Sequence, residues 1–199
     1  MGKITSFVNM SLDGFFEGKN HDISWHNVDE EFNQFAVEML KQTEIIIFGR
    51  RTYELFEEYW PKAARDPATS KSDLEIADLI NNMEKIVFSK TLQQPNEGEN
   101  WKNVRLIRKV VHEEIKELKR RCDQDLSVGG NNLLLTFARL GLLDEIRVMV
   151  NPVIIGEGNS LLKGIASQIK LELHDTRTFR SGNVLLTYEP LRSLPAEKA

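Results

Sequence analysis

Two glycine-containing turns carry the residue types that commonly bind anions. In the first, a short apolar run ends at Val128, Gly129 and Gly130, and an amphipathic segment follows directly after Asn131 and Asn132. Glycine lets the main chain approach a ligand closely, and a helix N-terminus adds about half a positive charge. The pattern therefore predicts either a tight turn or a phosphate cradle.

The second turn is Gly49-Arg50-Arg51-Thr52, which follows a continuous β-branched run. An arginine pair at the end of a buried strand suits bidentate phosphate recognition, and Thr52 could cap the helix while donating to an oxygen. The alternative is two surface arginines at a helix start, where positive charge is mildly unfavourable. Both interpretations stay open.

Two further strand ends carry weaker signals. Ser11-Leu12-Asp13-Gly14 is an Asp-Gly turn by default, and Ser89-Lys90-Thr91 could be ordinary surface residues. In open α/β sheets, however, ligands bind outside the carboxyl ends of the strands. Four such groups at one edge support each other and favour a binding site there.

Acid–base and metal chemistry have less support. Asp29 stands with two glutamates at a helix start, where capping competes with proton transfer as its role. His21 and His26 share a loop with no third ligand at metal-binding spacing, so we expect no metal site. The single cysteine, Cys122, excludes an intrachain disulfide, and the motifs of serine hydrolases, Rossmann folds and P-loops are missing from the sequence.

Composition narrows the class of protein. The 199 residues carry a net charge of −4, with a pI near 5.7 and 41% hydrophobic residues. This balance predicts a globular chain without a nucleic-acid surface, and no apolar run approaches the roughly 20 residues of a membrane span. A strand pattern begins at the N-terminus, where a signal peptide would stand, so we expect a cytoplasmic protein with no membrane partner.

Strands and helices alternate along most of the chain, which predicts an α/β protein of three layers, α/β/α, with a mixed, mostly parallel sheet. Residues 1–190 read as a single domain and 191–199 as a polar tail. The predicted strands are Ile4–Val8, Ile45–Phe48, Lys85–Ser89, Val104–Ile107, Leu126–Val128 and Glu145–Val150, followed by an antiparallel hairpin of Leu171–Thr176 and Val184–Tyr188. The predicted helices are Asp29–Lys41, Thr52–Tyr59 (stopped by Pro61), Leu74–Met83, Val111–Cys122 and Leu133–Leu140, with a loop over 61–73.

The order of these motifs resembles the dihydrofolate reductase-like superfamily, in particular the branch with the C-terminal reductase domain of bacterial riboflavin biosynthesis. The resemblance covers residues 2–189. It rests on Met10-Ser11-Leu12-Asp13-Gly14, Phe48-Gly49-Arg50-Arg51-Thr52-Tyr53-Glu54, Val128-Gly129-Gly130, Leu143-Asp144-Glu145-Ile146 and Asn151-Pro152-Val153-Ile154-Ile155-Gly156-Glu157-Gly158.

The resemblance implies an NADPH-dependent reductase of a small heterocyclic substrate, similar to the 5-amino-6-(5-phosphoribosylamino)uracil reductase of riboflavin biosynthesis. It implies a cofactor site of Gly49, Arg50, Arg51, Thr52, Ser89, Lys90, Val128, Gly129, Gly130, Asn131 and Asn132, with Lys90 near the 2′-phosphate. Ser11, Asp13, Gly14 and Trp25 would border the substrate, and Asp29 and Asp13 are the catalytic candidates. Asn131 and Asn132 replace the third glycine of dihydrofolate reductase itself, which argues against folate reduction.

Two alternatives stay open. The same fold could serve as a nucleotide- or pterin-binding protein without turnover, because no acid is assigned unambiguously.

The resemblance also implies a homodimer, in which Ile146–Val150 and the turn Asn151–Gly158 could pack against a second subunit. An ordinary core strand explains Ile146–Val150 equally well.

Overall fold

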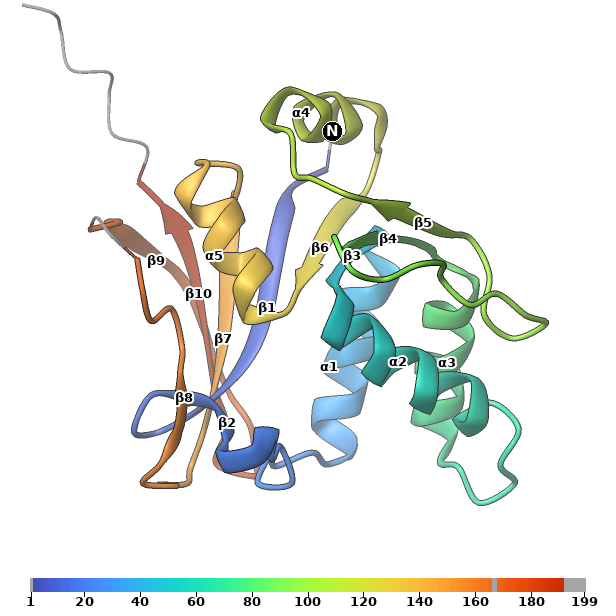
Figure 1. The fold of residues 1–199 in the computed structure, drawn as a ribbon. Coiled ribbons are helices and arrows are strands. Elements are labelled where there is room, and N and C mark those ends of the chain that lie inside the picture. Colours follow the sequence, from blue (N-terminus) through green and yellow to red (C-terminus); the bar gives the residue numbers. More distant parts are fainter. Residues whose placement is uncertain (1, 166–167, 192–199) are drawn as a thin grey trace, which may run out of the picture.

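A computed structural model describes residues 2–165 and 168–191 (Figure 1). One eight-stranded sheet has the order β5-β4-β3-β6-β1-β7-β10-β9, and β2 and β8 form a separate two-stranded sheet. The strands are β1 Ile4–Ser11, β2 Phe15–Gly18, β3 Thr43–Gly49, β4 Glu84–Phe88, β5 Val104–Ile107, β6 Asp125–Gly129, β7 Glu145–Asn151, β8 Gly158–Ser160, β9 Leu171–Thr178 and β10 Val184–Pro190. The helices are α1 Glu30–Lys41, α2 Arg50–Ala63, α3 Lys71–Asn82, α4 His112–Arg121, α5 Asn131–Arg139 and the 3₁₀ turn η1 Lys19–His21.

The large sheet is mixed, as the sequence predicted. β1, β3, β4, β5, β6 and β7 pair in parallel, and β10 pairs antiparallel with both β7 and β9. The hairpin of β9 and β10 thus closes one edge of a parallel sheet. This arrangement brings the carboxyl ends of the six parallel strands to one edge, where β2 and β8 also lie (Figure 1).

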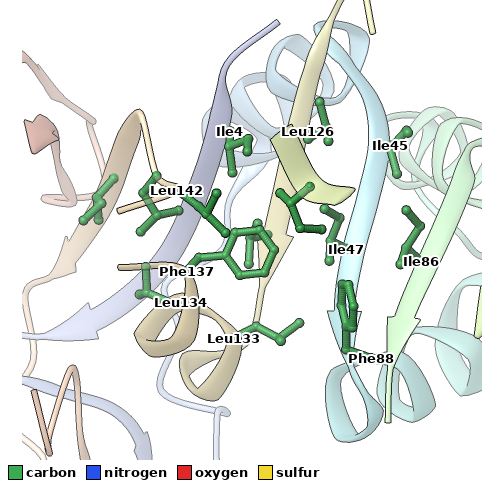
Figure 2. Packing of buried hydrophobic residues seen from close by; sticks show 14 of the residues in the cluster. Ile4, Ile45, Ile47, Ile86, Phe88, Leu126, Leu133, Leu134, Phe137 and Leu142 are labelled. Carbon is green, nitrogen blue, oxygen red and sulfur yellow. The ribbon is translucent and has the colours of Figure 1, made fainter. Parts of the chain in front are cut away.

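The helices cover both faces because the central strands are apolar on both. Ile47 in β3 is fully buried among α4, α5 and their strands, in the cluster of which Figure 2 shows part. Its neighbours in sequence, Ile46 and Phe48, point to the opposite face and pack with α1, α2 and α3. Full burial of such a side chain stabilises the fold by about 1.5–3 kcal/mol. The predicted three-layer α/β/α class is confirmed.

Helix α2 differs from the prediction at both ends. It begins at Arg50 with Gly49 at the N-cap position, so Thr52 does not cap it, and it continues past Pro61 to Ala63. Only two helical residues follow Pro61, and the Ala64 N–H closes the last turn on the Trp60 carbonyl at 3.1 Å. Pro61 has no N–H to donate within the helix, and the helix ends two residues after it.

Helix α3 begins three residues earlier than predicted, at Lys71. The Ser70 hydroxyl accepts a hydrogen bond from the Asp73 N–H at 3.1 Å and caps the helix. A serine followed three residues later by an acidic residue is the sequence signal for this start.

Strand β7 lies in the interior of the sheet, between β1 and β10. Met149 is fully buried, and Ile146 and Val148 belong to the core on the other face. Of the two interpretations of Ile146–Val150, the core strand is therefore the one that fits the structure. The tail predicted over 191–199 lies outside the described residues except for Leu191.

The two-stranded sheet of β2 and β8 was missed by the sequence analysis. A Cβ on Gly158 would lie 2.2 Å from the Glu17 carbonyl oxygen, so the two strands can approach only because residue 158 is glycine. Neither strand has an alternation of apolar residues long enough to predict a strand.

Among the described helices, none combines the length and apolar character that crossing a membrane requires.

Candidate functional site

The two predicted glycine turns meet at the carboxyl edge of the sheet. Phe48 of β3 is in register with Gly129 of β6, so the chain leaves these neighbouring strands side by side. Gly130 has φ +94°, and a Cβ there would lie 2.6 Å from Thr52 Oγ1. Glycine is thus required at 130 by both backbone conformation and space.

The helices that follow these turns start without a side-chain cap. Neither α2 nor α5 has one, and α4 also lacks one, whereas Asp29 caps α1 and Ser70 caps α3. The first N–H groups of an uncapped helix have no acceptor within the helix, and the helix dipole favours a negatively charged acceptor. Two such N-termini on adjacent strands form a cradle suited to a diphosphate.

Arg50 connects this cradle to the loop after β4. Its Nε donates to Glu54 at 2.7 Å, and its Nη1 donates to Thr91 Oγ1 at 3.0 Å. The predicted residue Lys90 is exposed beside Thr91. The Arg50–Thr91 contact therefore places the start of α2 beside the loop that carries Lys90.

Ser89 stabilises the loop that follows β4. It is buried, and its Oγ accepts hydrogen bonds from the N–H groups of Thr91 at 3.2 Å and Leu92 at 2.9 Å. Arg108, which the sequence analysis missed, donates to the carbonyls of Ser89 and Leu92. Ser89 and Arg108 therefore shape the loop that presents Lys90.

Two predicted cofactor residues contact the small sheet and the segment that follows it. Arg51 pairs with the buried Glu17 of β2 at 3.5 Å and also contacts His21. Asn131 Oδ1 accepts from the Leu162 N–H at 3.2 Å. We call residues 15–21 with 158–162 the flap; its attachment to α2 and α5 could not be seen from sequence because the partners are remote along the chain.

Ser11, Asp13 and Gly14 form the turn between β1 and the flap. Ser11 is fully buried, and its Oγ accepts from the Phe15 N–H at 3.0 Å. The Asp13 carboxylate accepts from the N–H groups of Ile155 at 3.2 Å and Gly156 at 2.8 Å. The Ser11 hydroxyl and these N–H groups lower the pKa of Asp13, which makes it an ionised acceptor that joins two loops.

Asp29 and Trp25 lie on the segment between the flap and α1. Asp29 Oδ1 accepts from the Phe32 N–H at 2.8 Å, which confirms the predicted place of Asp29 at the helix start. Trp25 Nε1 donates to the Asp22 carbonyl at 3.1 Å, and its ring meets His26 edge-on at 4.4 Å. Trp25 therefore folds against its own loop.

Buried amides at the ends of β1 and β7 were also missed by the sequence analysis. Asn151 is fully buried, donates to Asn9 Oδ1 at 3.1 Å and accepts from the Asn27 N–H at 2.8 Å. Asn183, also fully buried, donates to the Asn27 carbonyl at 2.8 Å. Asparagines scattered along the chain carry no spacing signal.

Other possible sites lie elsewhere or are not supported. Across the described residues, no group of three or more His, Cys, Asp or Glu side chains could hold a metal ion. Two clefts, of about 540 and 410 Å³, both touch α2 residues Glu58 and Lys62, and none of the predicted site residues lines either one. The carboxyl edge of the sheet remains the candidate site.

Comparisons with known proteins identify the family and the fold of this chain. The sequence profile of the RibD C-terminal domain family matches residues 2–185. The uncharacterized protein YyaP of Bacillus subtilis (strain 168) is 37% identical over 180 residues, which are 90% of each chain.

Two solved structures share the fold. The putative riboflavin biosynthesis protein of Shewanella sp. PV-4 superposes with a TM-score of 0.72 at 19% identity, over 96% of this chain and 99% of that one. Dihydrofolate reductase of Enterococcus faecalis, complexed with NADP(H) and RAB-propyl, gives a TM-score of 0.60 at 14% identity, over 95% and 96% of the chains. The fold is therefore dihydrofolate reductase-like, and the chain belongs to the RibD C-terminal domain family.

Proposed function

We propose that this protein is an NADPH-dependent reductase of a small heterocyclic substrate. The observation that carries the proposal is the pair of uncapped helix N-termini, α2 and α5, at the ends of two adjacent parallel strands. Membership of a family named for a riboflavin-pathway reductase domain, and a fold shared with dihydrofolate reductase, support it.

The residues present fit the proposed cofactor. The N–H groups at the starts of α2 and α5 would hold its diphosphate, and Gly129 and Gly130 allow the main chain to approach closely. Arg50 and Lys90 would meet the 2′-phosphate, because their side chains supply positive charge at one end of the cradle. NADPH supplies a hydride when bound, while the protein positions the reacting groups.

On the substrate side, some residues of the chain would fix the loops around the substrate, and one would transfer a proton. Asp13 and Ser11 fix the loops at the ends of β1 and β7. Asp29 is the carboxyl group we assign to proton transfer; since Oδ1 is held by the helix cap, the proton would be carried at Oδ2. The flap would limit access of water to this edge.

Titration of the intrinsic tryptophan fluorescence with NADPH and with NADH tests the proposal. We expect NADPH to bind more tightly, and Arg50→Ala and Lys90→Ala to weaken NADPH about tenfold, or 1.4 kcal/mol, with little effect on NADH. Arg105→Ala is the matched control, since Arg105 lies on the edge strand β5 and pairs with Glu84 of β4. Binding of neither nucleotide at millimolar concentration would refute the reductase; equal losses for both would refute the 2′-phosphate role.

A second function, nucleotide or pterin binding without turnover, is favoured by one observation. Both candidate acids, Asp13 and Asp29, accept backbone hydrogen bonds that suit structural roles. Stopped-flow absorbance with pyrimidine and pteridine substrates separates the two functions. A binding protein saturates with NADPH but does not oxidise it, whereas a reductase shows hydride transfer.

A further inference from the structure

Glu17 is the centre of the contacts that attach the flap to α2. Its Oε1 lies 2.7 Å from His21 Nδ1 and accepts a hydrogen bond from Asn159 Nδ2, also at 2.7 Å. Its Oε2 lies 3.5 Å from Arg51 Nη2. His21 and Asn159 belong to the two segments of the flap, whereas Arg51 belongs to α2. The carboxylate of Glu17 therefore joins both segments of the flap to the start of this helix.

The contacts of His21 Nδ1 conflict with each other. This nitrogen contacts both Glu17 Oε1 and Arg51 Nη1. An imidazole nitrogen that carries a hydrogen donates, and one that lacks a hydrogen accepts. With the hydrogen, Nδ1 suits the carboxylate but not the guanidinium; without it, Nδ1 suits the guanidinium but not the carboxylate. One contact is unfavourable in either tautomer, and departure of Arg51 would remove the conflict.

Arg51 is also the partner that can leave most easily. Its side chain is 56% exposed, whereas the side chain of Glu17 is 12% exposed. The Glu17–Arg51 pair, at 3.5 Å, is longer than the other two contacts of the carboxylate. If Arg51 turned away, Glu17 would keep His21 and Asn159 as partners. The exchange would therefore leave no buried charge without a hydrogen bond.

The cradle offers Arg51 a second anionic partner. Arg51 is the second residue of α2, in the uncapped first turn, where the N–H groups have no acceptor within the helix. A diphosphate held at this turn carries more negative charge than one carboxylate, and arginine binds phosphate oxygens through paired N–H donors. The cofactor and Glu17 would thus compete for one guanidinium.

We propose that Glu17 is an internal anion that occupies Arg51 in the free protein, and that Arg51 exchanges Glu17 for the cofactor's diphosphate. This inference rests on the proposed reductase function and adds a regulation of the same site. The exchange releases one attachment of the flap. Because linkage is reciprocal, Glu17 lowers cofactor affinity by the same factor by which bound cofactor weakens this attachment. The flap begins directly after the Ser11–Gly14 turn, so its release follows cofactor binding on the substrate side.

A double-mutant cycle measured by calorimetric titration with NADP⁺ tests the exchange. Glu17→Gln should tighten NADP⁺ binding about threefold, because Arg51 loses its internal partner. Arg51→Ala should weaken binding about tenfold. In the Arg51→Ala background, Glu17→Gln should have no effect, because there is no guanidinium left to compete for. This loss of effect distinguishes competition for Arg51 from general repulsion between Glu17 and the cofactor.

Two further variants and a second probe control the cycle. Glu157→Gln is the matched control, because Glu157 is an acid next to the flap that pairs with Lys19, and both side chains are exposed. It should leave NADP⁺ affinity unchanged. Inorganic diphosphate should reproduce the pattern of NADP⁺ across the cycle. Glu17→Asp has a shorter side chain that should also release Arg51, and it carries the test if Glu17→Gln fails to fold.

Hydrogen exchange of the β2 and β8 amides gives a readout that does not depend on activity. Arg51→Ala should speed this exchange about threefold in the free protein, because an attachment of the flap is lost. In the NADP⁺-saturated protein the variant and the wild type should exchange at the same rate, because Arg51 has already left Glu17. Faster exchange in the saturated variant would overturn the inference.

The outcomes separate the inference from the proposed function. Equal tightening by Glu17→Gln with and without Arg51, or no tightening at all, would overturn the exchange and leave the reductase standing. Equal tightening by Glu157→Gln would do the same, since it would show a general charge effect. Failure of both the wild type and Glu17→Gln to bind NADP⁺ at millimolar concentration would refute the reductase itself, and the exchange with it.

Discussion

Gly130 is the residue on which the geometry of the cradle depends. Its φ of +94° is strained for other residues, and Thr52 occupies the space where a Cβ would stand. The hydroxyl of Thr52 therefore serves as packing for the glycine turn rather than as a helix cap.

Gly130→Ala should lower the free energy of unfolding by about 1–3 kcal/mol and weaken NADPH binding, because the side chain forces the two helix N-termini apart. Urea unfolding and fluorescence titration measure the two effects. Gly141→Ala is the control: Gly141 also has a positive φ, +63°, but open space around its Cβ. Unchanged NADPH affinity in Gly130→Ala would contradict the cradle.

Lys85 is fully buried beneath the 96–102 loop. Its Nζ donates to the carbonyls of Asn81, Met83 and Lys102 at 2.7–3.0 Å and lies 4.5 Å from the centre of the Trp101 ring. Burial lowers the pKa of Lys85 to about 8, and Glu97 opposes the shift.

The unfolded chain therefore binds more protons than the folded one between about pH 8 and the ordinary lysine pKa of 10.5. Stability should rise across this window, by about 3 kcal/mol at most. Lys85→Met should remove this slope, even though it leaves three carbonyls without their donor. Urea unfolding from pH 7 to pH 10 measures it, and an identical slope in Lys85→Met would exclude Lys85 as its source.

Helix α1 begins at a residue with two possible roles. Asp29 caps the helix, and it is also the carboxyl group that we assign to proton transfer. Serine can replace the cap but cannot carry the proton of a carboxyl group.

Asp29→Ala should cost about 1 kcal/mol of stability, and Asp29→Ser should recover most of it. Both variants should lose turnover if Asp29 transfers a proton. Thermal unfolding and steady-state NADPH oxidation distinguish the two roles. Full turnover in Asp29→Ser would show that Asp29 acts only as a helix cap.

The flap is attached to the cradle through Glu17. This carboxylate is buried, contacts Arg51 and His21, and accepts from Asn159 Nδ2 at 2.7 Å. A ligand phosphate near Arg51 would compete with Glu17 for the guanidinium.

Glu17→Gln should speed hydrogen exchange of the β2 and β8 amides by roughly tenfold or more, because charged hydrogen bonds contribute more than neutral ones. Glu157→Gln, which breaks only the exposed pair with Lys19, should change exchange little. Exchange followed by mass spectrometry tests this. Similar rates in both variants would exclude Glu17 as the anchor of the flap.

At the level of the assembled protein, we propose a homodimer that uses the loops at the carboxyl edge. With β7 buried, the 152–157 turn is the part of the predicted interface that remains exposed. Ile154 is 71% exposed and Leu12 62%, and the Leu12 N–H binds the Val153 carbonyl at 2.8 Å. Exposed apolar side chains that gather in this way are typical of interfaces.

Sedimentation at micromolar concentration should show a dimer, and Ile154→Glu should shift it to monomer because a charge would be buried. Leu55→Glu is the control, since Leu55 on α2 is also an exposed apolar residue, at 50%. A monomeric wild-type protein would dismiss this interface.

The sequence by itself determined the eight strands of the large sheet and its five α-helices, although not the small sheet of β2 and β8. Apolar periodicity places the strands and helices, the two glycines mark the turn at 129–130, and Asp29 marks a helix start. These features are local, because each depends on residues within one or two turns of the chain. The general rule for open α/β sheets indicated the carboxyl edge as the site, and the family resemblance added the ligand expected there.

The tertiary structure alone decided which of these elements are neighbours. β6 inserts between β3 and β1, so Gly130 packs on Thr52, 78 positions away in sequence. Arg51 meets Glu17, and four asparagines from distant segments share one buried cluster. Such pairings follow from the burial of whole faces of the sheet, a nonlocal effect that no short stretch of sequence encodes.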